Sequence, residues 1–292
     1  MRTGELVAGS VVRNATEAWA RLAEFGWLFG LAFAWIAVIV IAAALADLLP
    51  LPSPTDMDML ARRAPPSFAH WLGTDRLGRD MLARLIFGAR ISLTVAILAP
   101  LIGLLIGGAL GILAGYFRGR LETLVVGGVD VLLAFPPLVL ALAVMAYLGQ
   151  TVANLTYIIG VLSIPAFTRV ARAATLSVAK REFILAARAM GATELRILLR
   201  ELLPNVILPL LAFFLLAVAV TIVVEGALSF LGLGVPPPAP SWGSMIGEGR
   251  ENLDIAPWLA FLPAGFMFLT VLAFNVIGDT LRALTDPRPG AL

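Results

Sequence analysis

Residues 175–204 read TLSVAKREFILAARAMGATELRILLRELLP. This stretch interrupts two long apolar runs, one ending at Thr168 and one starting at Asn205. The charged side chains of the interruption are Lys180, Arg181, Glu182, Arg188, Glu194, Arg196, Arg200 and Glu201. Because so many charges are too costly to place in hydrocarbon, the pattern predicts a folded excursion into water between two membrane spans.

Helix rules divide this excursion into two short helices. The first is predicted from about Arg181 to Met190, and Gly191 supplies a left-handed stop. Thr193 caps the second helix, with Glu194 in its first turn. The small residues Ala186, Ala187, Ala189 and Ala192 give the first helix a face that another protein can approach closely. The segment is therefore interpreted as a docking element for a cytoplasmic protein.

The composition of the whole chain is that of a polytopic membrane protein. Hydrophobic residues make up 60% and charged residues 14% of the 292 residues, whereas soluble domains carry about 25% charge. The mean hydropathy is +0.95. Several uncharged runs exceed the ~18 residues that indicate a membrane span.

Several classes of functional site are excluded, because some residue types do not occur in the sequence and others occur only once. There is no cysteine and only one histidine, His70, so thiolate chemistry, cysteine-based zinc sites and multi-histidine metal sites are excluded. The only lysine, Lys180, follows Ala179 rather than glycine, so the chain has no phosphate-binding P-loop. Any ATPase that powers it must be another polypeptide, and we expect no catalytic residue, cofactor or metal in this chain. The basic residues are interleaved with spans, which indicates membrane topology rather than nucleic-acid binding.

The apolar runs predict an all-α protein with six transmembrane helices. A polar N-terminal segment, 1–25, precedes a first span at 26–46. Residues 47–90 form a polar segment with an amphipathic helix. A core over 91–288 contains five further spans and is followed by a short tail, 289–292. The five core spans are expected at about 91–117, 121–147, 152–172, 205–229 and 255–280.

Local signals refine three parts of this scheme. Asp80 is predicted to cap an amphipathic helix over 80–90, with Arg84 off its apolar face, lying on the membrane surface or gating the substrate path. Phe135-Pro136-Pro137 is expected to kink or break the second core span. Gly149-Gln150-Thr151 divides the uncharged run 131–168 into a hairpin. The spacing of Gly103, Gly107 and Gly111 predicts close helix–helix contact.

Arginine and lysine positions predict the orientation. Fourteen of the 21 basic residues fall inside the cell, and seven outside, if both termini are cytoplasmic. The inside set is Arg2, Arg13, Arg21, Arg118, Arg120, Arg169, Arg172, Lys180, Arg181, Arg188, Arg196, Arg200, Arg282 and Arg288. This orientation places segment 175–204 in the cytoplasm.

The docking segment resembles the "EAA loop" of bacterial ABC-importer permeases, whose pattern is E-A-A, three residues, G, nine residues, I-x-L-P. Ala186, Ala187, Gly191, Leu203 and Pro204 occupy the matching places in register. Leu185 stands where the family has glutamate, and Glu201 where it has isoleucine. Glu182, one turn earlier, is a candidate replacement for the missing charge.

Further motifs between residues 65 and 288 resemble the C-type subunit of the dipeptide/oligopeptide/nickel branch of these permeases. They include HWLGTD at 70–75, LGRD at 77–80, DVLLAFP at 130–136, LSFLGLGV at 228–235 and PSWG at 240–243. The resemblance implies a type I ABC-importer permease in the bacterial inner membrane. It also implies a second homologous permease subunit, two cytoplasmic ATPase subunits that bind ATP and magnesium, and an extracytoplasmic solute-binding protein.

The same resemblance assigns the coupling to the ATPase to the helix near 183–190. The candidate docking residues are Glu182, Phe183, Ala186, Ala187, Arg188, Gly191, Ala192, Leu203 and Pro204. Membrane lipid is the remaining partner. A peptide is the substrate expected from base rates within the branch, and nickel or another small solute stays open because specificity is expected mainly in the binding protein.

Ionisable and polar groups within spans are further candidates, because a charge at the bilayer centre costs roughly 2.5–3.5 kcal/mol. Asp130 is expected to pair with Arg169 and fix the helix hairpin, or to contact the partner permease instead. Glu225 is expected as a solvated or hydrogen-bonded group near the outer surface, or as a contact for substrate or binding protein. Asn275 and Asp279 are expected to satisfy neighbouring helices. His70 is expected at the interface, with a nickel-ligand role as the alternative.

Three other function classes compete with the permease. A secondary transporter is expected to show several intramembrane charges or inverted repeats, and neither stands out here. A membrane-embedded enzyme has few catalytic groups available without cysteine, and no G-x-S-x-G motif occurs. A purely structural anchor gives no reason for the spacing of the docking segment.

Overall fold

The computed structural model describes residues 26–285, and every regular element in that range is a helix. The predicted N-terminal segment 1–25 and the tail 289–292 lie outside the described residues. The longer helices are α2 (Gly26–Ala44), α3 (Met81–Ile102), α4 (Gly108–Phe117), α5 (Gly119–Leu133), α6 (Pro137–Leu148), α7 (Val152–Val178), α10 (Leu203–Phe230) and α12 (Trp258–Thr285). The shorter ones are α8 (Glu182–Ala189), α9 (Glu194–Arg196) and α11 (Trp242–Gly249). Short 3₁₀ helices, η1 (Ala46–Leu48), η2 (Met59–Ala61) and η5 (Arg250–Asn252), lie in the connections.

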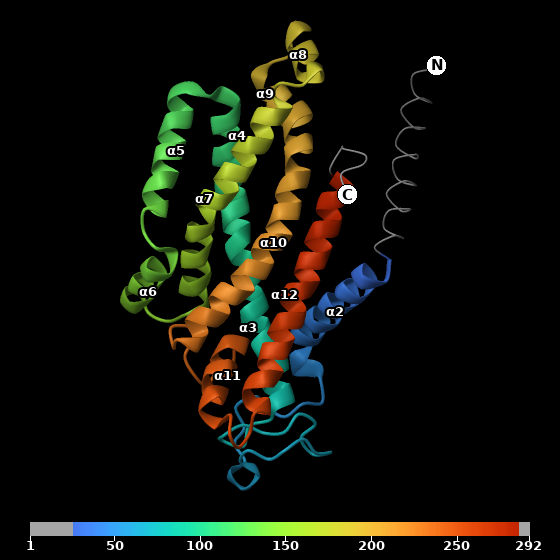
Figure 1. Cartoon of the computed structure of the whole chain (residues 1–292), viewed down its shortest axis with the longest axis vertical. Coiled ribbons are helices and arrows are strands. Elements are labelled where there is room, and N and C mark those ends of the chain that lie inside the picture. The colour runs from blue at the N-terminus through green and yellow to red at the C-terminus, as the bar shows by residue number, and fades with distance from the viewer. Residues whose placement is uncertain (1–25, 286–292) are drawn as a thin grey trace.

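Five helical segments within 26–285 are long and apolar enough to cross a membrane, and a bent helix pair raises the number to six. The five are Gly26–Ala44, Met81–Phe117, Val152–Val178, Glu194–Phe230 and Trp258–Ala283. The bundle is elongated (Figure 1), with α8 beyond one end of the long helices and α11 at the other. These two ends are called the α8 end and the α11 end below.

Residues 80–90 do not form the separate surface helix that their amphipathic pattern predicts. They begin a continuous helical segment, Met81–Phe117, that crosses the bundle with one π-helical turn at Gly103–Gly107. Asp80 caps this segment as predicted, since its side chain accepts a hydrogen bond from the Ala83 amide. Arg84 was placed off the apolar face, but its side chain is 1% exposed. It forms ion pairs with Asp75, nine residues earlier, and with Glu248 in α11, which the local pattern did not reveal.

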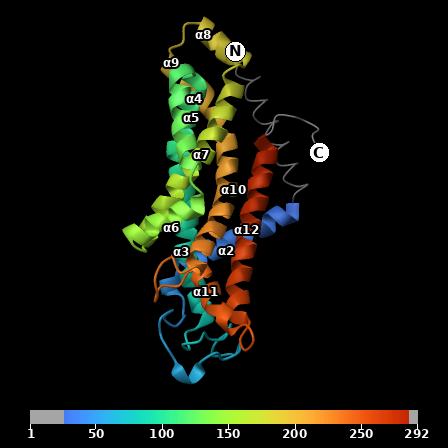
Figure 2. The ribbon, with the colours of Figure 1, turned by 60° about the vertical axis from the view of Figure 1, so that its left-hand side comes forward.

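The second core span is broken where the two prolines stand. Pro136 adopts an extended conformation, φ −58° and ψ 119°, because a residue before proline is driven out of the helical region. Pro137 then opens α6, which is turned by 77° from α5. Figure 2 shows α6 directed away from the bundle. The hairpin between α6 and α7 lies where the sequence predicts it: Gly149 ends α6 at φ +88°, and Thr151 caps α7.

Small residues let α3–α4 and α7 approach closely. A Cβ atom at Gly111 would lie 2.4 Å from the Thr168 carbonyl oxygen, and one at Gly107 would lie 2.5 Å from that of Ile164. The glycine spacing therefore brings backbones together as expected. On the other side of the bundle, α2 packs on α12, where the Trp35 indole donates a hydrogen bond of 3.0 Å to Thr270.

Candidate functional site: the two ends of the bundle

The docking segment folds as two short helices joined by a left-handed glycine. Helix α8 ends at Ala189, and Gly191 has φ +79° with no atom within 4 Å of the position of its missing Cβ. The Ala192 amide donates to the Ala187 carbonyl, closing the end of α8. Thr193 caps the next turn by accepting from the Arg196 amide, as predicted. A π-helical turn, η4 (Ile197–Leu202), continues into α10.

Helix α8 has an inner and an outer face. Ile184 and Ala187 are buried against Ile197, Leu202 and neighbouring side chains, which fixes α8 on the bundle. The exposed apolar side chains are Phe183 (39%) and Leu185 (53%), which lie on different sides of α8, and Met190 (82%), which directly follows it. The structure thus divides the predicted docking residues. Glu182, Phe183, Ala186, Arg188, Gly191 and Pro204 are exposed, Ala192 and Leu203 are half-buried, and Ala187 faces the core.

Polar contacts tie this segment to the end of α4. Arg188 donates to the Tyr116 hydroxyl at 3.1 Å and lies 3.5 Å from Glu194, while Tyr116 also donates to Glu194. The Tyr116 hydrogen bond is the largest of the causes that raise the pKa of Arg188. These groups are exposed apart from the half-buried Tyr116, so the α8 end presents apolar side chains beside water-accessible charge.

The Asp130–Arg169 pair is present in the structure. The Arg169 Nη2 atom donates to the Asp130 carboxylate at 2.8 Å, joining α5 to α7. Both side chains are more than half-exposed in this chain. The neighbouring Arg172 Nε donates to Glu122 at 2.8 Å, a second link between the same helices that the sequence did not predict.

Glu225 is hydrogen-bonded, which is one of the two alternatives predicted for its environment. It is not exposed to solvent, which the other alternative required. Its carboxylate accepts from Ser92 at 2.9 Å and from Ser229 at 2.7 Å, and the residue is fully buried between α3 and α10. The Trp242 backbone amide in turn donates to the Ser92 hydroxyl at 3.2 Å. Burial removes Glu225 from direct contact with water or with another protein in this conformation.

Asn275 and His70, two of the remaining polar candidates, have partners nearby in the sequence. The Asn275 amide donates to the Val271 carbonyl of its own helix at 2.9 Å, whereas a neighbouring helix was expected. Asp279 is exposed. The His70 ring lies 3.0 Å from the Asp80 carboxylate. Among residues 26–285 no group of three potential metal ligands lies close together.

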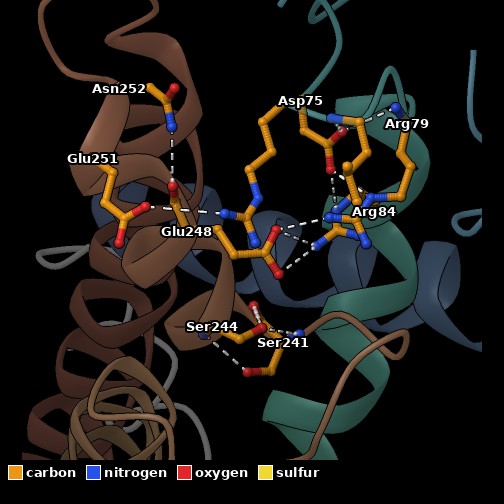
Figure 3. Close-up of polar contacts among 10 residues, drawn as sticks. Asp75, Arg79, Arg84, Ser241, Ser244, Glu248, Glu251 and Asn252 are labelled. Atoms are coloured by element: carbon orange, nitrogen blue, oxygen red, sulfur yellow. Dashed lines mark hydrogen bonds and ion pairs between the residues drawn. The ribbon is translucent and has the colours of Figure 1, made fainter. Parts of the chain in front are cut away.

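A cluster of four charges at the α11 end was missed by sequence reasoning. Asp75, Arg79, Arg84 and Glu248 form ion pairs with one another and are largely buried (Figure 3). The sequence feature that could have indicated this cluster is the high density of charged residues in DRLGRD, 75–80, directly before an apolar run. That feature does not name Glu248, which lies 164 residues beyond Arg84.

The comparisons with known proteins agree on one family. The family described as "binding-protein-dependent transport system inner membrane component" matches residues 107–290. The chain is 43% identical over 251 residues to the glutathione transport system permease protein GsiD of Pectobacterium atrosepticum, covering 86% of this chain and 83% of that protein. It is 42% identical over 272 residues to the protein of the same name in Escherichia coli O6:K15:H31, covering 93% and 90%.

Solved structures show the same fold. A chain of the inward-facing MetNI methionine ABC transporter superposes with a TM-score of 0.57 at 21% identity, covering 70% of this chain and 97% of that chain. The sequence resemblance to the dipeptide/oligopeptide branch is thereby confirmed. The chain belongs to the family of binding-protein-dependent transport system inner membrane components and is a multi-pass transport permease.

Proposed function

We propose that this chain forms one half of the translocation pathway of an ATP-driven importer of small peptides, with glutathione as the first substrate to test. The relatives named above are glutathione transport permeases, and glutathione is a short peptide. A second, homologous permease completes the pathway, and an extracytoplasmic solute-binding protein delivers the substrate. Two separate ATPase subunits bind ATP and magnesium, because the chain has no P-loop lysine.

The observation that carries the coupling proposal is the outer face of α8. It stands beyond the ends of the long helices, and among the described residues Leu185 and Met190 are left 53% and 82% exposed there. Exposed apolar groups rimmed by charge are typical of a protein-binding surface. We assign this face to the ATPase, with α8 seated in a groove of that subunit so that closure of the groove moves the spans.

The α8 end lies in the cytoplasm in this proposal, and both termini do as well. The count of basic residues supports it, fourteen on the cytoplasmic side against seven outside in this orientation. Seven of the fourteen, Arg118, Arg120, Lys180, Arg181, Arg188, Arg196 and Arg200, lie in or next to the docking segment and at the α4–α5 turn. The α11 end then faces the solute-binding protein.

Co-purification and uptake test this proposal. The tagged chain, extracted in mild detergent, should bring with it a second permease and two P-loop ATPases identified by mass spectrometry. Reconstituted with its binding protein, the complex should accumulate labelled glutathione in an ATP-dependent way. Recovery of the chain alone would overturn ATP-driven transport, and a complex that moves other peptides but not glutathione would overturn the first substrate.

Gly191→Val is the sharpest variant, because a β-branched residue is strained at φ +79°. We expect it to enter the membrane normally but to lose ATPase association and uptake. Gly232→Val is the matched control, since Gly232 has φ +83° and equally open surroundings at the α11 end. Equal loss of ATPase association in both variants would mean that strain in general, rather than the docking segment, is responsible.

A further inference from the structure

Four charged side chains meet at the α11 end, where Asp75 and Arg79 precede α3, Arg84 lies in its first turn, and Glu248 is near the end of α11. Arg79 Nε lies 2.6 Å from Asp75 Oδ2, and Arg79 Nη2 lies 2.8 Å from Glu248 Oε2. Arg84 Nη2 lies 3.2 Å from the same Glu248 oxygen, and Arg84 Nε lies 3.5 Å from Asp75 Oδ2. Figure 3 shows the Glu248 carboxylate pointing from α11 toward both guanidinium groups. These four residues are called the charge clamp.

The charge clamp is electrically balanced, with two arginines and two carboxylates. Arg79 is 3% and Glu248 21% exposed, and buried charges of this kind are stable only while each keeps its partner. Arg84 Nε and Nη1 have no hydrogen-bond partner among the described residues, so Arg84 depends on its contacts through Nη2 and on the nearby Asp75. Without Glu248, two arginines would face one carboxylate.

The clamp holds a segment that is already folded on itself. The Asp75 carboxylate accepts from the Leu77 and Arg79 amides at 2.8 and 3.0 Å and so fixes the turn between them. Gly78, at φ +77°, passes so close to Asp58 that an added Cβ would collide with its backbone. The pair between Arg79 and Glu248 therefore fastens residues 58–80 as a unit to α11.

Helix α11 is itself wedged among three long helices. The Trp242 indole donates to the Leu85 carbonyl of α3 at 3.0 Å. A Cβ at Gly243 would lie 2.4 Å from the Gly226 carbonyl oxygen in α10, and one at Gly249 would lie 2.6 Å from the backbone of α12. Helix α11 is thus in close contact with α3, α10 and α12 at once.

We propose that the charge clamp joins segment 58–80, α11 and the adjoining ends of α3, α10 and α12 into one rigid block, with Glu248 as its positioning residue. This inference rests on the proposed function, in which the solute-binding protein docks at the α11 end. Docking then moves the ends of three spans as one body instead of deforming a loop.

Hydrogen exchange tests the rigid block without any transport assay. The full complex in nanodiscs is compared with its Glu248→Gln variant and with Glu251→Gln, three residues further on, which is 65% exposed and 3.9 Å from Arg76. We expect Glu248→Gln to raise amide exchange in residues 62–80 about tenfold and to leave α7 unchanged. Glu251→Gln should match the native protein. Native protection of 62–80 in Glu248→Gln would overturn the inference.

A second arm measures coupling in proteoliposomes. Glu248→Gln should keep basal ATPase activity within about twofold, while stimulation by the substrate-loaded binding protein falls about tenfold. Full stimulation in this variant would overturn the inference. Failure of the native complex to hydrolyse ATP or to take up substrate would overturn the proposed function instead, and the exchange result would still stand.

If the Glu248→Gln variant fails to assemble with its partner subunits, a double substitution tests the rigid block instead. Arg84→Met with Glu248→Met removes one charge of each sign and leaves Asp75 and Arg79 as a neutral pair, while methionine fills comparable volume. We expect the double variant to assemble and to protect residues 62–80 better than either single variant. A double variant no better than the worse single variant would overturn charge balance as the basis of the block.

Discussion

The α8 end and the α11 end carry similar charged groups in opposite surroundings. At the α8 end, Arg188 and Glu194 are both more than half-exposed and lie 3.5 Å apart. At the α11 end, Arg79 and Arg84 are buried and share the Glu248 carboxylate. Exposed ion pairs contribute roughly 0–1 kcal/mol, whereas breaking a buried pair costs about 3–5 kcal/mol. The charges of the α8 end are thus open to water, whereas those of the α11 end are held in one arrangement by their partners within the chain.

Substitution of one carboxylate at each end tests this contrast most strongly. Asp75→Asn should lower the unfolding free energy by about 3 kcal/mol, because the amide cannot serve the two arginines of the clamp. Glu194→Gln should cost about 1 kcal/mol or less, since its charge is exposed. Thermal unfolding of both variants in detergent measures the difference. Similar losses in both would remove the distinction between the two ends.

Substitution of an apolar residue at each end tests recognition. Met190→Asp should weaken ATPase association about tenfold or more with little change in thermal stability, because a buried interface cannot accept an unpaired carboxylate. Leu253→Asp, at an exposed apolar position near α11, should leave ATPase association unchanged. Binding of purified ATPase to the reconstituted permease gives both affinities. Weakening of association by both variants would show that the effect is not local to α8.

The Asp130–Arg169 pair lies between the two ends of the bundle. Charge swaps at this pair should reduce uptake by an amount intermediate among the effects predicted here. Exchange of either residue for the opposite charge replaces the ion pair by two like charges on facing helices, so each single swap should reduce uptake about tenfold. The double swap, Asp130→Arg with Arg169→Asp, should recover about half of native uptake. A double swap that transports no better than either single swap would leave Asp130 with a role in the partner contact instead.

Substitution of Asn275 should have the smallest effect on uptake and on stability. Its amide donates to the Val271 carbonyl, a group that also belongs to the helix hydrogen-bond pattern of α12. Asn275→Leu should therefore keep uptake within about twofold and stability within roughly 1 kcal/mol. Uptake assays and thermal unfolding measure the two quantities. A large loss of uptake at unchanged stability would show that Asn275 contacts the substrate path.

Several features of the fold follow from short stretches of sequence. The uncharged runs locate the spans, and Pro136-Pro137 locates the break between α5 and α6. Gly191 and Thr193 locate the turn and cap of the docking segment. All of these depend on hydropathy or on the dihedral preferences of one to four residues. Local physics is enough for the break, the turn and the cap, which lie where the sequence predicts them. It does not fix the helix ends, since the helix of the span predicted at 91–117 begins at Met81.

The sequence also determined the membrane class, the exclusion of a P-loop and the order of motifs that placed the chain in its family. Tertiary structure alone decided which face of α8 is covered, so that Ala187 is buried while Ala186 is exposed. It likewise decided that Arg84 and Glu225 are buried, where the sequence pattern placed them toward water. The reason is physical: a buried ionisable group is tolerated only when polar partners surround it. Those partners come from distant parts of the chain, Glu248 for Arg84 and Ser92 for Glu225.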